Sequence, residues 1–168
     1  GYTCVAGSEQ DVLSRYLLAA KASSADVIVR ITGDCPLIDP ALVDTAIRNF
    51  RASNVDYFSN VAPATYPDGL DIEVFTTAAL ERASRETEKA FDLEHVTPYL
   101  REKEGYRRAG MQHSTDLSGL RWTVDELADL QVVTKVFEHF SPDIHFGWLQ
   151  ILALQNSQPE TFTANATL

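Results

Sequence analysis

Residues 25–40 limit the fold of this chain more than any other stretch. Residues 25–31 form a short apolar run rich in β-branched side chains, which is typical of a strand buried on both faces of an α/β sheet. After the run, Asp39 is a good helix N-cap and Pro40 suits the first helical position. The sequence therefore predicts a central strand, a turn and a helix, with Asp34 at the carboxyl end of the strand.

Asp34 and Asp125 are candidate metal ligands. Ligands of open α/β sheets bind at the carboxyl ends of strands, where Asp34 is expected. Asp125 holds an equivalent position, because it follows the apolar segment 120–124 and opens an amphipathic helix. Paired carboxylates of this kind bind Mg²⁺ on a nucleoside triphosphate and neutralise charge that develops during phosphoryl transfer. The alternative is that both aspartates are ordinary helix N-caps.

Hydrophobic periodicity predicts the remaining elements. Strands are expected over 2–6, 55–59, 72–75, 106–113 and 120–124, and helices over about 9–20, 40–52, 77–89, 91–103, 125–140 and 146–156, before a weakly ordered tail. The helix over 91–103 is expected to kink at its internal proline. This succession indicates a single three-layer α/β domain over 1–168, with 1–59 and 114–156 as framework and 60–113 inserted at the ligand edge.

The composition argues against several classes of partner. Acidic residues outnumber basic ones 24 to 14, for a net charge of -10, and no Lys/Arg cluster is present to neutralise a nucleic acid or a membrane surface. No apolar run approaches the length of a membrane span. The two cysteines are too few for a disulfide framework, which fits a reducing cytoplasm. The sequence also lacks a P-loop, a Gly-x-Gly-x-x-Gly turn and the signatures of Ser/His/Asp or Cys/His nucleophiles.

The loop over residues 66–73 is the second candidate site. Its carboxylates Asp68, Asp71 and Glu73 surround a turn at Gly69 and can accept hydrogen bonds from sugar hydroxyls or supplement a metal site, although a solvated acidic loop is an alternative. The pair Glu94 and His95 can bind a sugar hydroxyl or carboxylate, or can serve in packing and capping. Arg15 and Arg30 can meet phosphate or balance nearby aspartates.

Five blocks of the chain, in order, closely resemble the spore-coat polysaccharide cytidylyltransferase-like proteins, which are relatives of the acylneuraminate and deoxy-manno-octulosonate cytidylyltransferases. The blocks are GSEQDVLSRY at 7–16, DVIVRITGDCPLID at 26–39, YPDGLDIEVF at 66–75, EHVTPY at 94–99 and LRWTVDE at 120–126. The resemblance covers nearly the whole chain. It implies a Rossmann-like, three-layer nucleotide-diphospho-sugar transferase fold with a mixed sheet.

The activity that this resemblance implies is attack of a sugar hydroxyl on the α-phosphorus of CTP, giving a CMP-sugar and pyrophosphate for surface polysaccharide or glycan biosynthesis. Asp34 and Asp125 match the family's two Mg²⁺-binding aspartates. The resemblance puts Gly7, Ser8, Thr32 and Gly33 on the nucleotide side and Tyr66, Asp68, Gly69, Asp71, Glu73, Glu94 and His95 on the sugar side. Relatives of this kind often form homodimers, so a second copy of the chain is a candidate partner.

One departure from the family pattern concerns the triphosphate. The family opens with a strand and a loop of the type Ala-Arg-x-x-Ser-x-Arg-x-x-x-Lys, which nothing here matches, so the chain is expected to lack the first strand and helix units, roughly 70 residues. Such a chain is expected to be inactive, or stable only with a partner over an exposed sheet edge. Two alternatives stay open: another sugar nucleotidyltransferase or a metal-dependent glycosyltransferase, and a non-catalytic sugar- or nucleotide-binding module.

Overall fold

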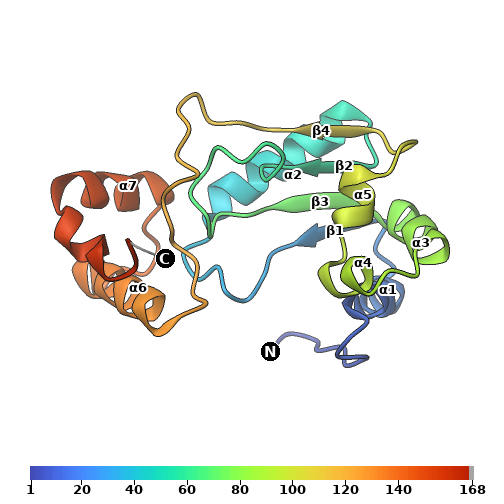
Figure 1. Cartoon of the computed structure of the whole chain (residues 1–168), viewed down its shortest axis with the longest axis horizontal. Helices are drawn as coiled ribbons and strands as arrows, with labels where there is room; N and C mark the ends of the chain where they lie inside the picture. Colours follow the sequence, from blue (N-terminus) through green and yellow to red (C-terminus); the bar gives the residue numbers. More distant parts are fainter. Residues whose placement is uncertain (167–168) are drawn as a thin grey trace.

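A mixed sheet of four strands forms the middle layer of residues 1–166, which are the residues that the computed structural model describes (Figure 1). The strands are β1 (Val27–Arg30), β2 (Tyr57–Ser59), β3 (Glu73–Thr76) and β4 (Arg108–Gly110). They lie in the order β1-β3-β2-β4; β3 is antiparallel to both of its neighbours, and β2 is parallel to β4. The predicted α/β fold with a mixed sheet is confirmed.

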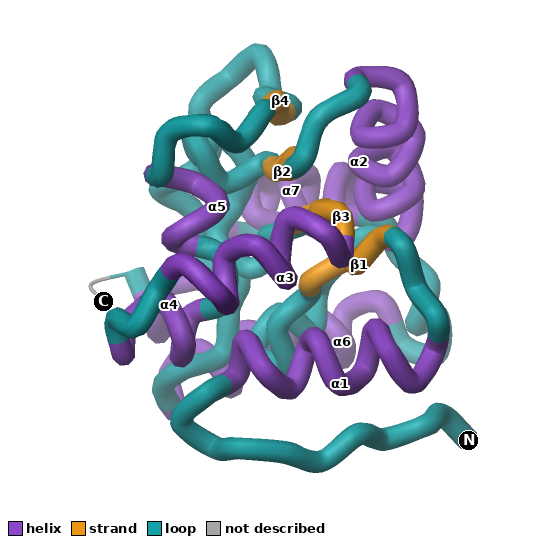
Figure 2. Tube along the Cα trace, turned by 90° about the vertical axis from the view of Figure 1, so that its right-hand side faces the viewer, coloured by secondary structure: helices purple, strands orange, loops and turns teal. Residues whose placement is uncertain are grey.

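Alternate side chains of the inner strands pack into two separate hydrophobic cores. Phe58 and Val74 lie in the first core, and their neighbours Tyr57 and Phe75 lie in the second. Helices of the first core are α2 (Pro40–Ser53), α6 (Leu127–Phe140), α7 (Trp148–Ser157) and the 3₁₀ helix η1 (Pro159–Asn165). The second core contains α1 (Val12–Ser23), α3 (Thr77–Glu86) and α5 (Pro98–Glu102), and α4 (Ala90–His95) packs against α1 (Figure 2). Helices therefore cover both faces of the sheet, which gives the three predicted layers.

Within residues 1–166 the strand β1 lies at an edge of the sheet. The sequence predicted a central strand, and it also predicted an exposed sheet edge in a chain that lacks the family's first strand. Within residues 1–166 β1 pairs only with β3, and Val27 is 37% exposed. Ile28 still packs in the second core and Val29 against the first. The apolar pattern thus predicted the covered faces correctly. It could not predict the lateral neighbours, because strands pair through backbone groups that every residue carries.

Two further predicted strands do not form. Residues 2–6 have no strand assignment, and residues 120–124 make a single bridge, between Arg121 and Asp68. The segment 120–124 is apolar because Trp122 is fully buried, not because it lies within the sheet. An alternating apolar pattern indicates an extended, half-buried segment. Here loop residues, not neighbouring strands, form the hydrogen bonds with that segment.

The end of the chain is more ordered than predicted. Instead of a weakly ordered tail, residues 159–165 form η1, with Phe162 and Asn165 buried; residues 167–168 lie outside the described part. The range 60–113, expected as an insertion, supplies β3 and β4 to the sheet itself. The single-domain assignment over 1–168 stays a prediction. No helix within residues 1–166 is long and apolar enough to cross a membrane.

The buried carboxylate of Asp39 caps the N-termini of two helices. Oδ1 of Asp39 accepts hydrogen bonds from the backbone of Ala41 and Leu42, at 2.7 and 3.0 Å, as predicted for the cap of α2. Its Oδ2 accepts from the backbone N–H of Trp148 at 2.9 Å, at the start of α7. This second contact joins the beginnings of two helices that are more than 100 residues apart in the chain.

Candidate active site

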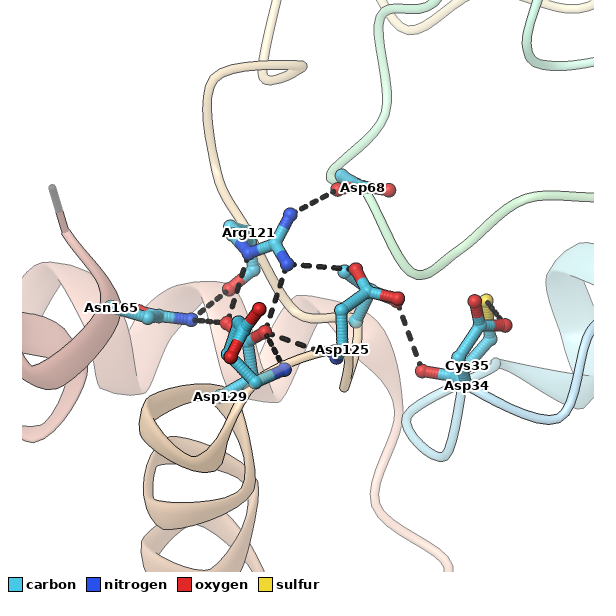
Figure 3. A network of polar contacts seen from close by, with 9 residues as sticks. Asp34, Cys35, Asp68, Arg121, Asp125, Asp129 and Asn165 are labelled. Atoms are coloured by element: carbon cyan, nitrogen blue, oxygen red, sulfur yellow. Dashed lines mark hydrogen bonds and ion pairs between the residues drawn. The ribbon is translucent and has the colours of Figure 1, made fainter. Parts of the chain in front are cut away.

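Backbone hydrogen bonds hold the segment before Asp125 against the turn that carries Asp34. The carbonyl oxygen of Asp34 accepts from the backbone N–H of Val124 at 2.8 Å and from the hydroxyl of Thr123 at 3.1 Å. Asp34 follows β1 at its carboxyl end, and Figure 3 shows both aspartates in one neighbourhood. The two residues are 91 positions apart in sequence, yet they lie on adjoining segments beyond the carboxyl end of β1.

The two carboxylates differ in their contacts. Oδ2 of Asp125 accepts from Nη2 of Arg121 at 2.7 Å, and the Asp125 side chain is 52% exposed. Asp34 is half-buried, and its Oδ1 accepts a weak hydrogen bond from the Cys35 thiol at 3.6 Å. Among residues 1–166 no group of three or more His, Cys, Asp or Glu side chains is arranged to hold a metal. Two carboxylates are nevertheless enough for Mg²⁺ that takes its other ligands from phosphates and water.

Gly69 lets the loop over residues 66–73 approach this edge. Its φ is +105°, and a β-carbon there would lie 2.6 Å from the carbonyl carbon of Trp122. Only glycine avoids both the strained dihedral and this contact. Next to it, the backbone of Asp68 pairs with the segment before Asp125, and the Asp68 carboxylate lies 3.4 Å from Nη1 of Arg121. Close backbone packing explains Gly69 without a substrate.

The loop carboxylates share a partly dehydrated environment. Burial, helped by the charges of Asp68, Glu73 and Asp34 and opposed by that of Arg30, raises the pKa of Asp71 to about 6. Burial also raises the pKa of Asp68, against the lowering effect of Arg121. Shifts of this kind, caused by burial and like charge together, are frequent at functional sites.

Glu73 was predicted to contact a sugar, but other side chains of the sheet already occupy its carboxylate. It is buried on β3, where its carboxylate accepts from the Tyr57 hydroxyl at 2.5 Å and pairs with Arg30 at 2.6 Å. Arg30 lies directly opposite it on β1. Both oxygens of Glu73 are thus engaged inside the sheet.

Glu94 and His95 are exposed on α4, and the structure does not bring them to Asp34 and Asp125. The His95 ring packs on Phe91, with ring centroids 4.4 Å apart. Figure 1 shows α4 beside α1 and α3, at the other end of the molecule from α6 and α7. Tyr66 is half-buried and packs edge-on against Trp148, with centroids 5.6 Å apart.

A cavity of about 380 Å³ lies between α1 and the end of β1. Its lining residues are Val5, Val12, Arg15, Tyr16, Ala19, Arg30, Ile31, Thr32 and Gly33. Two of the four predicted nucleotide residues, Thr32 and Gly33, are among them, and the other two, Gly7 and Ser8, lie between lining residues in sequence. None of the nine carries a carboxylate and two are arginines, which suits an anionic ligand in a chain of net charge -10. A larger cavity, of about 760 Å³, includes Ala25 and Asp26 before β1, at the end away from Asp34.

The sequence analysis missed three residues of this neighbourhood, Arg121, Asp129 and Asn165. Arg121 contacts Asp125, Asp129 and Asp68, and Asn165 contacts Asp129 (Figure 3). The four-residue spacing of one arginine and two aspartates, at 121, 125 and 129, was a usable signal. Nothing in the sequence pointed to Asn165, which comes from the C-terminal segment.

Comparisons with known proteins agree with this architecture. A sequence model of the cytidylyltransferase family matches residues 1–157. An uncharacterized protein of Methanocaldococcus jannaschii is 33% identical to the chain, over 100% of the chain and 69% of that relative. The spore coat polysaccharide biosynthesis protein SpsF of Bacillus subtilis is 28% identical, over 97% of the chain and 68% of the relative.

A solved structure is also similar. The structure of a cytidylyltransferase from Leptospira borgpetersenii superimposes with a TM-score of 0.91 at 30% identity, over 96% of this chain and 68% of that one. The resemblance seen in the sequence is therefore confirmed by a family match and by a shared fold. The chain belongs to the cytidylyltransferase family.

Proposed function

We propose that this chain takes part in cytidylyl transfer from CTP to a sugar. A sugar hydroxyl attacks the α-phosphorus, the bond to the β-phosphate oxygen breaks, and a CMP-sugar and pyrophosphate result. The observation that carries the proposal is the pair Asp34 and Asp125 on adjoining segments, beside a cavity lined by arginines and by no carboxylate. Membership of the cytidylyltransferase family supports the nucleotidyl-transfer class.

The proposed roles follow from these positions. Asp34 and Asp125 would hold Mg²⁺, which neutralises the charge of the triphosphate when bound. Thr32 and Gly33, with the adjacent Gly7 and Ser8, would bind the nucleotide in the cavity. Tyr66, Asp68 and Asp71 would orient the sugar by accepting or donating hydrogen bonds. Most of the catalysis would then come from positioning and charge neutralisation.

Glu73, Glu94 and His95 are not among the direct contacts of this proposed site. Glu73 would act indirectly, by holding Arg30 at the cavity, because its carboxylate is already engaged. Contacts of Glu94 and His95 with a sugar stay a prediction, since α4 lies away from the other candidates. Their alanine variants would test it through the Michaelis constant for the sugar.

The name of one relative supports a biosynthetic setting. SpsF of Bacillus subtilis is named for spore coat polysaccharide biosynthesis, so we place the product of this chain among precursors of surface polysaccharide or glycan. The proposed site of action is the cytoplasm, where nucleoside triphosphates are available; both cysteines are free thiols in the structure. A homodimer stays a prediction that sedimentation of the purified chain would test.

Calorimetric titration of CTP with Mg²⁺ tests the proposal without knowledge of the sugar. If the chain forms the metal and nucleotide site without the family's signature loop, it binds CTP, and Asp34→Asn weakens that binding about 10- to 100-fold because a metal ligand is lost. No binding would instead fit the expected lack of that loop. Asp44→Asn, an exposed change on α2 outside this edge, is the matched control and leaves the affinity unchanged.

Two results would contradict the proposal. Equal affinity for CTP, UTP and GTP would favour another nucleotidyltransferase or a glycosyltransferase, and CTP binding that ignores Asp34→Asn would favour a non-catalytic binding module. Pyrophosphate release from CTP in the presence of a panel of sugars then decides whether the bound nucleotide reacts.

A further inference from the structure

One guanidinium lies at the centre of three carboxylates at the candidate active site. Arg121 donates to Asp129 from Nε at 2.9 Å and from Nη2 at 2.8 Å, which is a bidentate pair. Its Nη2 also reaches Oδ2 of Asp125 at 2.7 Å, and its Nη1 lies 3.4 Å from Oδ2 of Asp68. Figure 3 shows Arg121 between these side chains. One positive charge therefore faces three negative ones.

Of the three carboxylates, Asp129 is the fixed one. It is 0% exposed and also accepts from the amide of Asn165 at 2.8 Å and from the backbone N–H groups of Asp125 and Glu126 at 3.1 and 2.9 Å. These donors, with Arg121 as the largest contributor, hold the pKa of Asp129 well below its usual range. Asp129 is thus saturated with donors and is closed to solvent, so it anchors Arg121 rather than binding a ligand.

The backbone of Arg121 is held as firmly as its side chain. The Asn165 amide donates to the Arg121 carbonyl at 3.2 Å, and the next residue, Trp122, donates to the carbonyl of Asp68 at 2.7 Å. Asn165 belongs to η1, beyond residues 1–157 that the family model matches. The C-terminal segment therefore completes the support of this arginine.

The two remaining carboxylates are exposed and depend on Arg121 for their position. The side chains of Asp125 and Asp68 are 52% and 44% exposed, and Arg121 contacts Oδ2 of each. An exposed aspartate without such a partner samples several rotamers. The guanidinium is planar and cannot lose its proton, so it orients carboxylates better than lysine does.

We propose that Arg121 is a positioning residue for Asp125, and that Asp129 and Asn165 hold Arg121 in place. The inference rests on the proposed function, in which Asp125 is a metal ligand. Arg121 would have two separate effects there. Its hydrogen bonds orient the Asp125 carboxylate and connect it to Asp68. Its positive charge lowers the affinity of the neighbouring carboxylates for a free divalent cation.

The test measures these two effects separately on the full chain. Affinity for Mn²⁺ alone, from electron paramagnetic resonance of the free ion, reports charge; turnover of CTP reports geometry. Arg121→Gln removes a positive charge near the ion, so we expect Mn²⁺ to bind about 3- to 10-fold tighter. We expect turnover to fall about 10- to 100-fold, because the ligand loses its orientation. Misfolding would lower both quantities.

Two more variants divide the effects further. Arg121→Lys keeps the charge and loses the bidentate pair, so Mn²⁺ affinity should stay within about twofold while turnover falls. Asn165→Ala leaves all charges in place and should lower turnover alone. The control is Arg107→Gln, which breaks the exposed pair with Asp56, just before β4 and β2, and should change neither quantity.

Several outcomes would overturn the inference. These are weaker Mn²⁺ binding by Arg121→Gln, no measurable Mn²⁺ binding by the unaltered chain, or turnover of Arg121→Gln equal to that of Arg107→Gln. Failure of the proposed function looks different. In that case the chain binds Mn²⁺ through Asp34 but transfers no cytidylyl group, and the Mn²⁺ affinities of Arg121→Gln and Arg121→Lys still decide whether the charge of Arg121 acts on the bound ion.

Discussion

At the scale of single residues, buried polar groups decide how the sheet is held. Glu73 lies between the guanidinium of Arg30 and the hydroxyl of Tyr57, and it is 2% exposed. A buried ion pair is costly to break because the remaining charge is left without a partner. Asp71 is half-buried, and within residues 1–166 it forms no ion pair, so its charge is costly in the folded state.

Tyr57→Phe should destabilise the fold by about 1–3 kcal/mol, because the buried Glu73 carboxylate loses a donor. Urea denaturation measures the change. The control is Tyr99→Phe, whose hydroxyl donates to the exposed Glu86 at 3.3 Å and should cost less than about 0.5 kcal/mol. Equal effects of the two substitutions would show that the Glu73 contact contributes nothing special.

Asp71→Asn should stabilise the chain at pH 8 and not at pH 4. The folded pKa of Asp71, about 6, lies above the value of about 3.9 in an unfolded chain, so the folded state holds its proton more tightly. Stability is therefore lost as the pH rises from about 4 through about 6, and asparagine avoids this loss. We expect a gain of about 1–3 kcal/mol at pH 8 in urea denaturation.

The matched control for that experiment is Asp44→Asn on the exposed face of α2. A gain for Asp71→Asn that is the same at both pH values would contradict the burial argument, since it would then not depend on ionisation. Because Asp71 belongs to the proposed sugar contacts, the stabilised variant should also lose affinity for the sugar.

At the scale of elements, shared caps join helices that packing alone would leave independent. Asp39 closes the open N–H groups of both α2 and α7, while Asp11 serves only α1 through Ser14. Unsatisfied N–H groups at a buried helix start are costly. One aspartate thus fixes the angle at which α7 meets the first core.

Asp39→Ala should cost about 2 kcal/mol, twice the usual value for one cap, because three backbone N–H groups lose their acceptor. Asp11→Ala is the single-cap comparison and should cost about 1 kcal/mol. Both are measured by thermal or urea unfolding. If the two costs are equal, the contact with Trp148 does not contribute to stability.

At the scale of the whole molecule, the charge is distributed unevenly along one edge. The acidic cluster around Arg121 adjoins the turn of Asp34, and the cavity with Arg15 and Arg30 ends at Gly33, the residue before it. A metal-bound triphosphate needs both kinds of surroundings. The overall charge of -10 gave no indication of this separation.

The predicted features that depend on local order were largely recovered. Asp39 and Pro40 start α2 as expected, and α6 ends at Phe140, as predicted for the helix over 125–140. What failed depended on distant partners. Residues 120–124 were expected to be a strand and instead bond to loops. Strand pairing joins generic backbone groups, so side-chain patterns cannot name the neighbour.

The sequence by itself determined the family, the α/β class, most helix starts and the candidate aspartates, because caps, turns and apolar periodicity are encoded within a few neighbouring residues. Only the tertiary structure decided which carboxylates are usable. In the fold, Glu73 is buried and paired with Arg30, and Asp129 is buried and accepts a hydrogen bond from Asn165. Asp125 stays exposed and pairs with Arg121. Burial and charge pairing arise between residues tens of positions apart, and they decide whether a carboxylate supports the fold or meets a ligand.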